Sequence, residues 1–136
     1  MSNGAATPRE MARRLLAHEV RGSNPPDVAD AAERVCGKLE GQLVDLIGAK
    51  SYRAIVHRAL RTAQTRFSFL RGIEVGGEGE ECLKGLEQNV QGQDPDSMYQ
   101  ALETIVAGTL ALLIDLIGEE LALRRMRRGW PELWSG

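Results

Sequence analysis

The chain has 136 residues, of which 43% are hydrophobic and 26% are charged, and its formal net charge is −2 at pH 7. A chain of this length can bury a core without disulfides or metal ions, so we expect a single helical domain over residues 1–136. The near-neutral charge gives no general attraction to nucleic acid or to an anionic membrane, and nucleic acid is therefore not an expected partner.

The first predicted helix runs from about Pro8 to Arg21. Thr7 and Glu10 have capping-box spacing, and Pro8 suits the first helical turn. Asn24 then caps a second predicted helix, from Pro25 to Gly48, with an apolar stripe at helical spacing.

A third helix is predicted over about Ser51–Phe67, and it has the clearest amphipathic pattern in the chain. Arg53, His57 and Arg61 line the face opposite the apolar one. This basic face is either simply solvated or a docking surface for an acidic partner.

Residues 72–81 are rich in glycine and acid, which predicts the principal loop, with a short extended piece at Ile73–Val75. A short fourth helix follows, containing Leu83, Leu86 and Val90 and closing at Gly92.

The fifth predicted helix, Asp94–Gly118, is the most apolar segment. Asp94 and Pro95 mark its start, and Gly118 marks its end. The apolar residues from Ile105 to Ile114 fall on nearly every side, as expected for a central helix. A membrane span needs roughly 20 apolar residues, about twice this run, so we predict no transmembrane segment.

The second and fifth helices resemble each other at a constant offset of 70 residues. Leu43 and the run 45–48 are identical to Leu113 and the run 115–118. The match predicts a duplication with units at residues 8–71 and 79–136, related by a pseudo-two-fold.

The duplicated helices each end with an acid, Asp45 and Asp115, three residues before the terminal glycine. A carboxylate there opposes the helix dipole, which predicts a structural acid pair neutralised by following-helix arginines. The candidate partners are Arg53 or Arg58 for Asp45, and Arg124 or Arg125 for Asp115.

A sixth helix is predicted over Glu119–Arg128, with acids in its first turn and arginines in its last turns. Beyond it lie the only two tryptophans. This segment either binds RNA or a membrane surface, or folds back to seal the core while its arginines meet loop acids at residues 78–81. The predicted interaction residues here are Arg124, Arg125, Arg128, Trp130 and Trp134.

The segment Ala17–Ser23 contains a helical histidine followed by an apolar residue, a basic residue, glycine and serine. It resembles the short signature of histidine phosphotransfer domains. The resemblance implies that His18 accepts a phosphoryl group and that Arg21 helps to hold it. The helix-ending residues Gly22 and Pro25 depart from that family, in which the helix continues through the motif. A solvated histidine near a helix C-terminus explains His18 as well.

The sequence predicts an all-α bundle of about six helices, formed by two pseudo-symmetric three-helix units. Zinc-protease, di-iron and nucleophile-elbow motifs are absent from the sequence, so we expect no enzyme, metal or cofactor. Cys36 and Cys82 are far apart in the sequence, which predicts reduced thiols. Residues 1–6 do not resemble a signal peptide, which predicts a cytoplasmic protein.

The leading functional hypothesis is an adaptor that binds protein and forms a homodimer. Phosphoryl transfer through His18 is the alternative, and binding through the Arg/Trp segment is a third.

Overall fold

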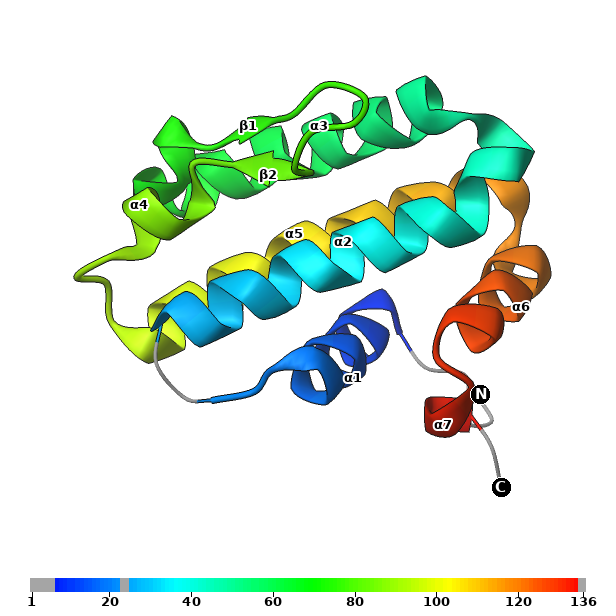
Figure 1. Ribbon diagram of the computed structural model, residues 1–136, viewed down its shortest axis with the longest axis horizontal. Helices are drawn as coiled ribbons and strands as arrows, with labels where there is room; N and C mark the ends of the chain where they lie inside the picture. The colour runs from blue at the N-terminus through cyan, green and yellow to red at the C-terminus, as the bar shows by residue number, and fades with distance from the viewer. Residues whose placement is uncertain (1–6, 23–24, 135–136) are drawn as a thin grey trace.

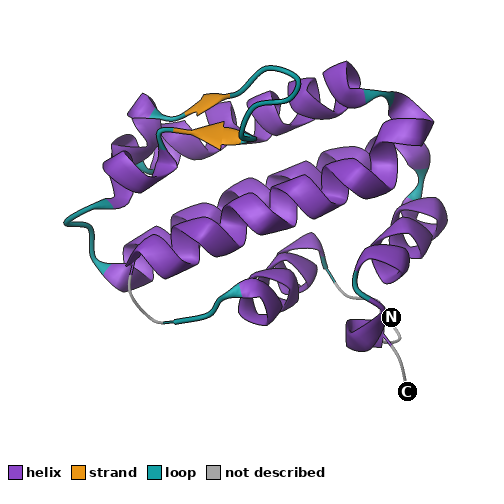
Figure 2. Ribbon diagram, in the orientation of Figure 1, coloured by secondary structure: helices purple, strands orange, loops and turns teal. Residues whose placement is uncertain are grey.

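The computed structural model describes residues 7–22 and 25–134, and these residues are mostly helical (Figure 2). The described part contains seven α-helices, five of them at least seven residues long, with one 3-10 helix and one short hairpin. The predicted all-α fold is confirmed. In chain order the elements are α1 (Pro8–Glu19), α2 (Pro25–Ile47), α3 (Ala49–Arg66), η1 (Ser68–Gly72), β1 (Glu74–Val75), β2 (Leu83–Lys84), α4 (Leu86–Val90), α5 (Pro95–Ile117), α6 (Glu119–Gly129) and α7 (Pro131–Trp134).

The helices α2 and α5 lie side by side at the centre and run in the same direction (Figure 1). The helices α1 and α3 pack on opposite sides of this pair, and both run antiparallel to it. The helix α6 crosses the end where α2 and α5 terminate and contacts both. The two central helices therefore supply the surface on which the other helices pack.

The central position of α5 follows from its composition. Nine of its residues are buried, and they face α1, α2, α3 and α6. By length and composition alone α5 could also cross a membrane. In this structure half of its most apolar stretch is buried by the neighbouring helices.

Two glycines make the corners after the central helices. Gly48 separates α2 from α3 with φ 86° and ψ 152°, and Gly118 separates α5 from α6 with φ 90° and ψ 152°. A side chain is strongly disfavoured at these dihedral angles, so one glycine alone turns the chain between two helices. Both corners have the same backbone geometry, and both preceding helices have 23 residues.

The duplication remains a prediction, but its register agrees with these elements. The bounds of α2 and α5 differ by the predicted 70 residues at both ends. The predicted cap Asn24 lies outside the described residues, whereas Asp94 caps α5 by accepting a hydrogen bond from the backbone N–H of Ser97 at 3.1 Å.

The loop after η1 is folded back as a hairpin. β1 pairs antiparallel with β2, with Val75 opposite Leu83. The predicted extended piece is thus present, but the fourth helix begins only at Leu86 rather than near Leu83. The reason is that Leu83 is drawn into the strand pair, and Gly85, in a left-handed conformation, separates that pair from the helix.

The C-terminal segment is anchored to α1 through a buried acid. Glu19 is 5% exposed, and its carboxylate accepts hydrogen bonds from Lys38 Nζ at 2.6 Å and from Trp130 Nε1 at 2.8 Å. The Trp130 side chain is fully buried in the core. Burial alone would raise the pKa of Glu19, but the hydrogen bonds from Lys38 and Trp130 outweigh it, and the pKa lies below its usual value.

We predict that Glu19→Gln lowers the free energy of unfolding by about 2 kcal/mol at pH 7, because Lys38 and Trp130 lose a charged acceptor. A depressed carboxyl pKa stabilises the fold above the usual value of about 4.3, and this contribution disappears as the pH falls through the lowered pKa. The difference between variant and wild type should therefore shrink in acid. Urea unfolding at pH 7 and pH 3 measures it. Glu78→Gln on the exposed loop is the control, and an equal loss there would contradict the prediction.

Candidate functional site

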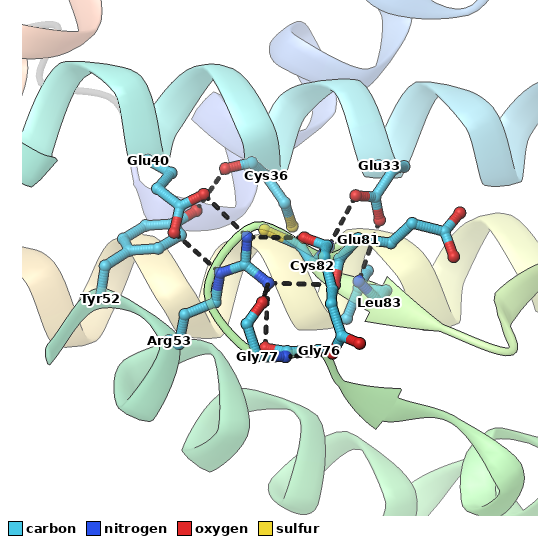
Figure 3. A network of polar contacts seen from close by, with 11 residues as sticks. Glu33, Cys36, Glu40, Tyr52, Arg53, Gly76, Gly77, Glu81, Cys82 and Leu83 are labelled. Carbon is cyan, nitrogen blue, oxygen red and sulfur yellow. Dashed lines mark hydrogen bonds and ion pairs between the residues drawn. The ribbon is translucent and has the colours of Figure 1, made fainter. Parts of the chain in front are cut away.

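The sequence pattern predicts that Arg53 lies on an exposed face of the third helix, but the structure places it in a network of contacts. Its side chain is only 11% exposed, and it joins three elements (Figure 3). The guanidinium forks onto the Glu40 carboxylate of α2 at 2.8 and 2.9 Å. It also donates to four carbonyl oxygens of the β1–β2 loop at 2.9–3.2 Å, those of Gly76, Gly77, Glu80 and Glu81.

We call Arg53 and its six hydrogen bonds the Arg53 clamp. The Glu40 contact raises the pKa of Arg53 further above its already high value, so the guanidinium stays charged. Glu33, which lies on α2 as Glu40 does, also holds the hairpin. Its carboxylate accepts hydrogen bonds from the backbone N–H groups of Cys82 at 2.7 Å and Leu83 at 2.9 Å. Together Arg53 and Glu33 hold the hairpin against α2, so both residues have structural roles.

The basic side chains between residues 50 and 71, other than that of Arg53, are solvent-exposed. The stretch from residue 46 to residue 73 contains no aspartate or glutamate. No ion pair joins the exposed arginines of this stretch to any carboxylate in the described part of the chain. Four of these exposed residues, His57, Arg58, Arg61 and Arg71, are called the basic face below.

A groove of about 400 Å³ runs between α3 and the first strand of the hairpin, along the basic face. His57, Arg61 and Arg71 line it, together with Glu74. Its other lining residues are Leu60, Gln64, Ile73 and Val75. Gln64 is not available to a ligand, because its amide already donates to the backbone oxygens of η1 and its cap. We call this hollow the basic groove.

A second groove, of about 480 Å³, lies on the other side of α3, against α5 and the start of α1. It is mainly apolar, and small side chains line it because α3 and α5 approach closely at Ala59 and Gly108. Arg58 borders it, as does Arg9, whose guanidinium is paired with Glu103 at 3.0 Å. Exposed arginines of α3 thus border both grooves, Arg61 the basic groove and Arg58 the apolar one.

The predicted C-terminal interaction segment is split by the structure. Arg124 and Arg128 are exposed on α6. Trp130 is buried and forms part of the core. Its position agrees with the alternative in which this segment folds back onto the core. Among the residues that the structure describes, however, the α6 arginines form no ion pair with the loop acids at residues 78–81. The side chain of Trp134 lies outside the described residues.

The two repeated acids differ in their surroundings. Asp45 is paired with Arg125, at 2.8 Å, and this guanidinium also donates to the backbone oxygen of Gln42 at 3.1 Å. The sequence pattern predicts Arg53 or Arg58 as the partner of Asp45, and Arg124 or Arg125 as the partner of Asp115. Both predictions are wrong among the described residues, because α6 packs across α2 and brings Arg125 to Asp45, while Arg53 pairs with Glu40. Asp115 is exposed, with no ion pair among the described residues. The two aspartates therefore do not form a matched pair.

The histidine of the phosphotransfer-like segment stands at the end of its helix. The side chain of His18 is 30% exposed, and its Nε2 atom lies 3.9 Å from a carboxylate oxygen of Glu132. The helix α1 ends at Glu19, and Val20 is already extended. Arg21 is exposed beyond it. The segment thus lacks the continuous helix of that family, and an acid occupies the space beside the histidine.

Sequence reasoning missed Glu33, Glu40 and Arg71. Glu40 is 13 residues from Arg53 and on another helix, and the loop's acceptors are backbone oxygens, which leave no signal in the sequence. In the described part of the chain, no cluster of three or more histidine, cysteine, aspartate or glutamate side chains could hold a metal ion.

Comparison with protein-family models, curated proteins and solved structures gives no significant match for this chain. Any functional proposal therefore depends on the geometry described above.

We predict that Arg53→Met lowers the free energy of unfolding by about 3 kcal/mol, because it leaves the partly buried Glu40 carboxylate without its cation. Arg53→Lys should recover only part of this, since an ammonium cannot reproduce the fork. Urea unfolding measures both variants. Arg61→Met, an exposed arginine of the same helix, should change stability by less than about 0.5 kcal/mol. Equal effects of the two methionine variants would refute the clamp.

Proposed function

We propose that the protein is a non-enzymatic helical adaptor, cytoplasmic, that binds an acidic segment of a partner protein in the basic groove. The observation that carries this proposal is the convergence of His57, Arg61 and Arg71 on one groove, with no carboxylate paired to any of them in the described part of the chain. Cations that are not neutralised within the fold attract an anionic partner, both in encounter and in the complex.

The composition of the groove favours a peptide over a bare anion. Leu60 and Ile73 are buried and form an apolar floor beneath the cations, and Val75 is half-buried beside them. A segment with carboxylates and neighbouring apolar side chains would match both parts of this surface. Glu74, at the edge of the groove, would disfavour binding in registers that bring a carboxylate against it.

We predict that a short fluorescein-labelled polyglutamate peptide binds the wild-type protein and that added salt weakens the binding. The double variant Arg61→Glu/Arg71→Glu should lower the affinity at least tenfold, because it replaces two attractive charges by repulsive ones. Fluorescence anisotropy gives the dissociation constants.

The matched control is Arg124→Glu/Arg127→Glu, which makes the same change in charge on exposed residues of α6. It should leave the affinity within about twofold. If both variants weakened binding equally, the interaction would be a general charge effect and the groove would not be the site. Preferential binding of an RNA oligonucleotide or anionic vesicles, lost in the α6 variant, would favour the Arg/Trp alternative instead.

The predicted homodimer has its own candidate surface. Three large apolar side chains are exposed on the last turns of the central helices: Val44 (42%), Leu46 (39%) and Leu116 (58%). These turns end at the same end of the molecule (Figure 1). Leu46 and Leu116 also occupy equivalent places in the proposed repeat. We propose that this end of the molecule, with its exposed apolar side chains, packs on the same end of a second copy.

Light scattering tests the dimer against the monomer mass of 14.9 kDa. We expect twice this mass for the wild type at tens of micromolar, and the monomer mass for Leu46→Glu/Leu116→Glu, which places charges in the apolar contact. Gln88→Glu/Gln91→Glu, on exposed positions near α4, is the control. A wild type that stays monomeric would eliminate this part of the proposal.

A further inference from the structure

Cys36 and Cys82 are 46 residues apart in the chain, yet the fold brings them together. Cys36 lies in the middle of α2, and Cys82 immediately precedes β2. Both are free thiols, and each is only 1% exposed. In Figure 3 the two sulfur atoms point toward each other. The prediction of reduced thiols is confirmed, because both cysteines are free, and the fold in addition places their side chains in contact.

The position of Cys82 is fixed from both sides. Its backbone N–H donates to Glu33, and the oxygen of the preceding residue, Glu81, accepts from Arg53 at 3.0 Å. The facing turn of α2 is held as well, since the Tyr52 hydroxyl donates to the Cys36 carbonyl oxygen at 2.8 Å. The hydrogen bonds that attach the hairpin to α2 therefore also hold the two thiols close to each other.

We propose that Cys36 and Cys82 form a reversible intramolecular disulfide by exchange with a small-molecule disulfide such as oxidised glutathione. The bond would link the hairpin covalently to α2. This proposal does not depend on the acidic partner, because the cross-link is measured without one.

The exchange balances in two steps. The Cys82 thiolate attacks oxidised glutathione, which forms a mixed disulfide and releases one glutathione thiolate. The Cys36 thiolate then attacks the Cys82 sulfur, which forms the internal disulfide and releases the second glutathione. The two cysteines lose two protons and two electrons, oxidised glutathione gains both electrons, and the two released glutathione thiolates take up the protons.

Reaction requires the loop to open. In the closed fold, the contact with Cys82 and burial raise the pKa of the Cys36 thiol, and only a thiolate attacks a disulfide. The covering segment, residues 77–81, is itself exposed, and it is held by the Arg53 clamp. Opening this short segment admits the reagent to Cys82, so the strength of the clamp sets the rate of oxidation.

The test treats the folded wild-type protein with oxidised glutathione, and intact mass spectrometry with peptide mapping follows the product. We expect a mass lower by two hydrogens, a Cys36–Cys82 cross-linked peptide, and reversal by dithiothreitol. Closing so long a loop should raise the midpoint of thermal unfolding by about 10 °C. Cys36→Ser and Cys82→Ser should show neither the cross-link nor the shift.

A wild type that gains only glutathione, or does not react below its unfolding transition, would overturn the proposal, and this outcome needs no variant to fold.

The clamp is tested with Arg53→Lys, whose fold is checked by circular dichroism. Because a weaker clamp opens more often, the cross-link should form about tenfold faster in this variant. An unchanged rate would overturn the loop-opening route. Because polyglutamate binding is measured with reduced protein, failure of either proposal leaves the other intact.

Discussion

Burial of the apolar helix α5 is the constraint on which the rest of the structure depends. An amphipathic helix needs one covering partner, but α5 has apolar residues on nearly every side and must be covered by several. The helices α1, α2, α3 and α6 all contribute to this cover. Because α2 lies parallel to α5, no short connection can join these two helices directly, and the chain between them is long enough to form α3 and the hairpin. The exposed basic face is thus carried on a helix whose other side is needed for the core.

Each central helix has a glutamate at the equivalent position of the proposed repeat, and each glutamate holds a neighbouring segment by hydrogen bonds. Glu103 on α5 holds α1 through Arg9 at 3.0 Å and Arg13 at 3.2 Å. Glu33, its counterpart 70 residues earlier, holds the backbone at Cys82 and Leu83, and these residues are the counterparts of Ala12 and Arg13. The same kind of contact is therefore made twice, with side-chain donors in one half and backbone donors in the other. The correspondence supports the proposed duplication even though α1 and the hairpin differ in local structure.

Local information in the sequence was sufficient for the helices and insufficient for the contacts between them. Thr7 and Asp94 mark helix starts through neighbours three residues away, and Gly118 marks an end, so these boundaries were predictable. Arg125 could not be assigned correctly because its partner Asp45 is 80 residues away and depends on how α6 crosses α2. The counterpart of Arg125 in the first unit is Ile55, which explains why the repeat does not reproduce this ion pair at Asp115. Trp130 beside arginines had the composition of a binding surface, and only its distant partner Glu19 distinguishes it as core.

The chemistry of the Arg53 clamp has a consequence for how this protein can change during evolution. Four of its six hydrogen bonds end on backbone oxygens, which every amino acid supplies. Substitutions at residues 77, 78, 80 and 81 therefore leave these bonds intact, provided that the path and length of the loop are kept, whereas Gly79, with φ 86°, favours glycine. Arg53 and Glu40 have no such freedom, because a change in either one breaks the fork. In homologous proteins we would expect variable side chains in this loop above an unchanged arginine and glutamate. The exposed loop could then acquire new surface chemistry without loss of the fold beneath it.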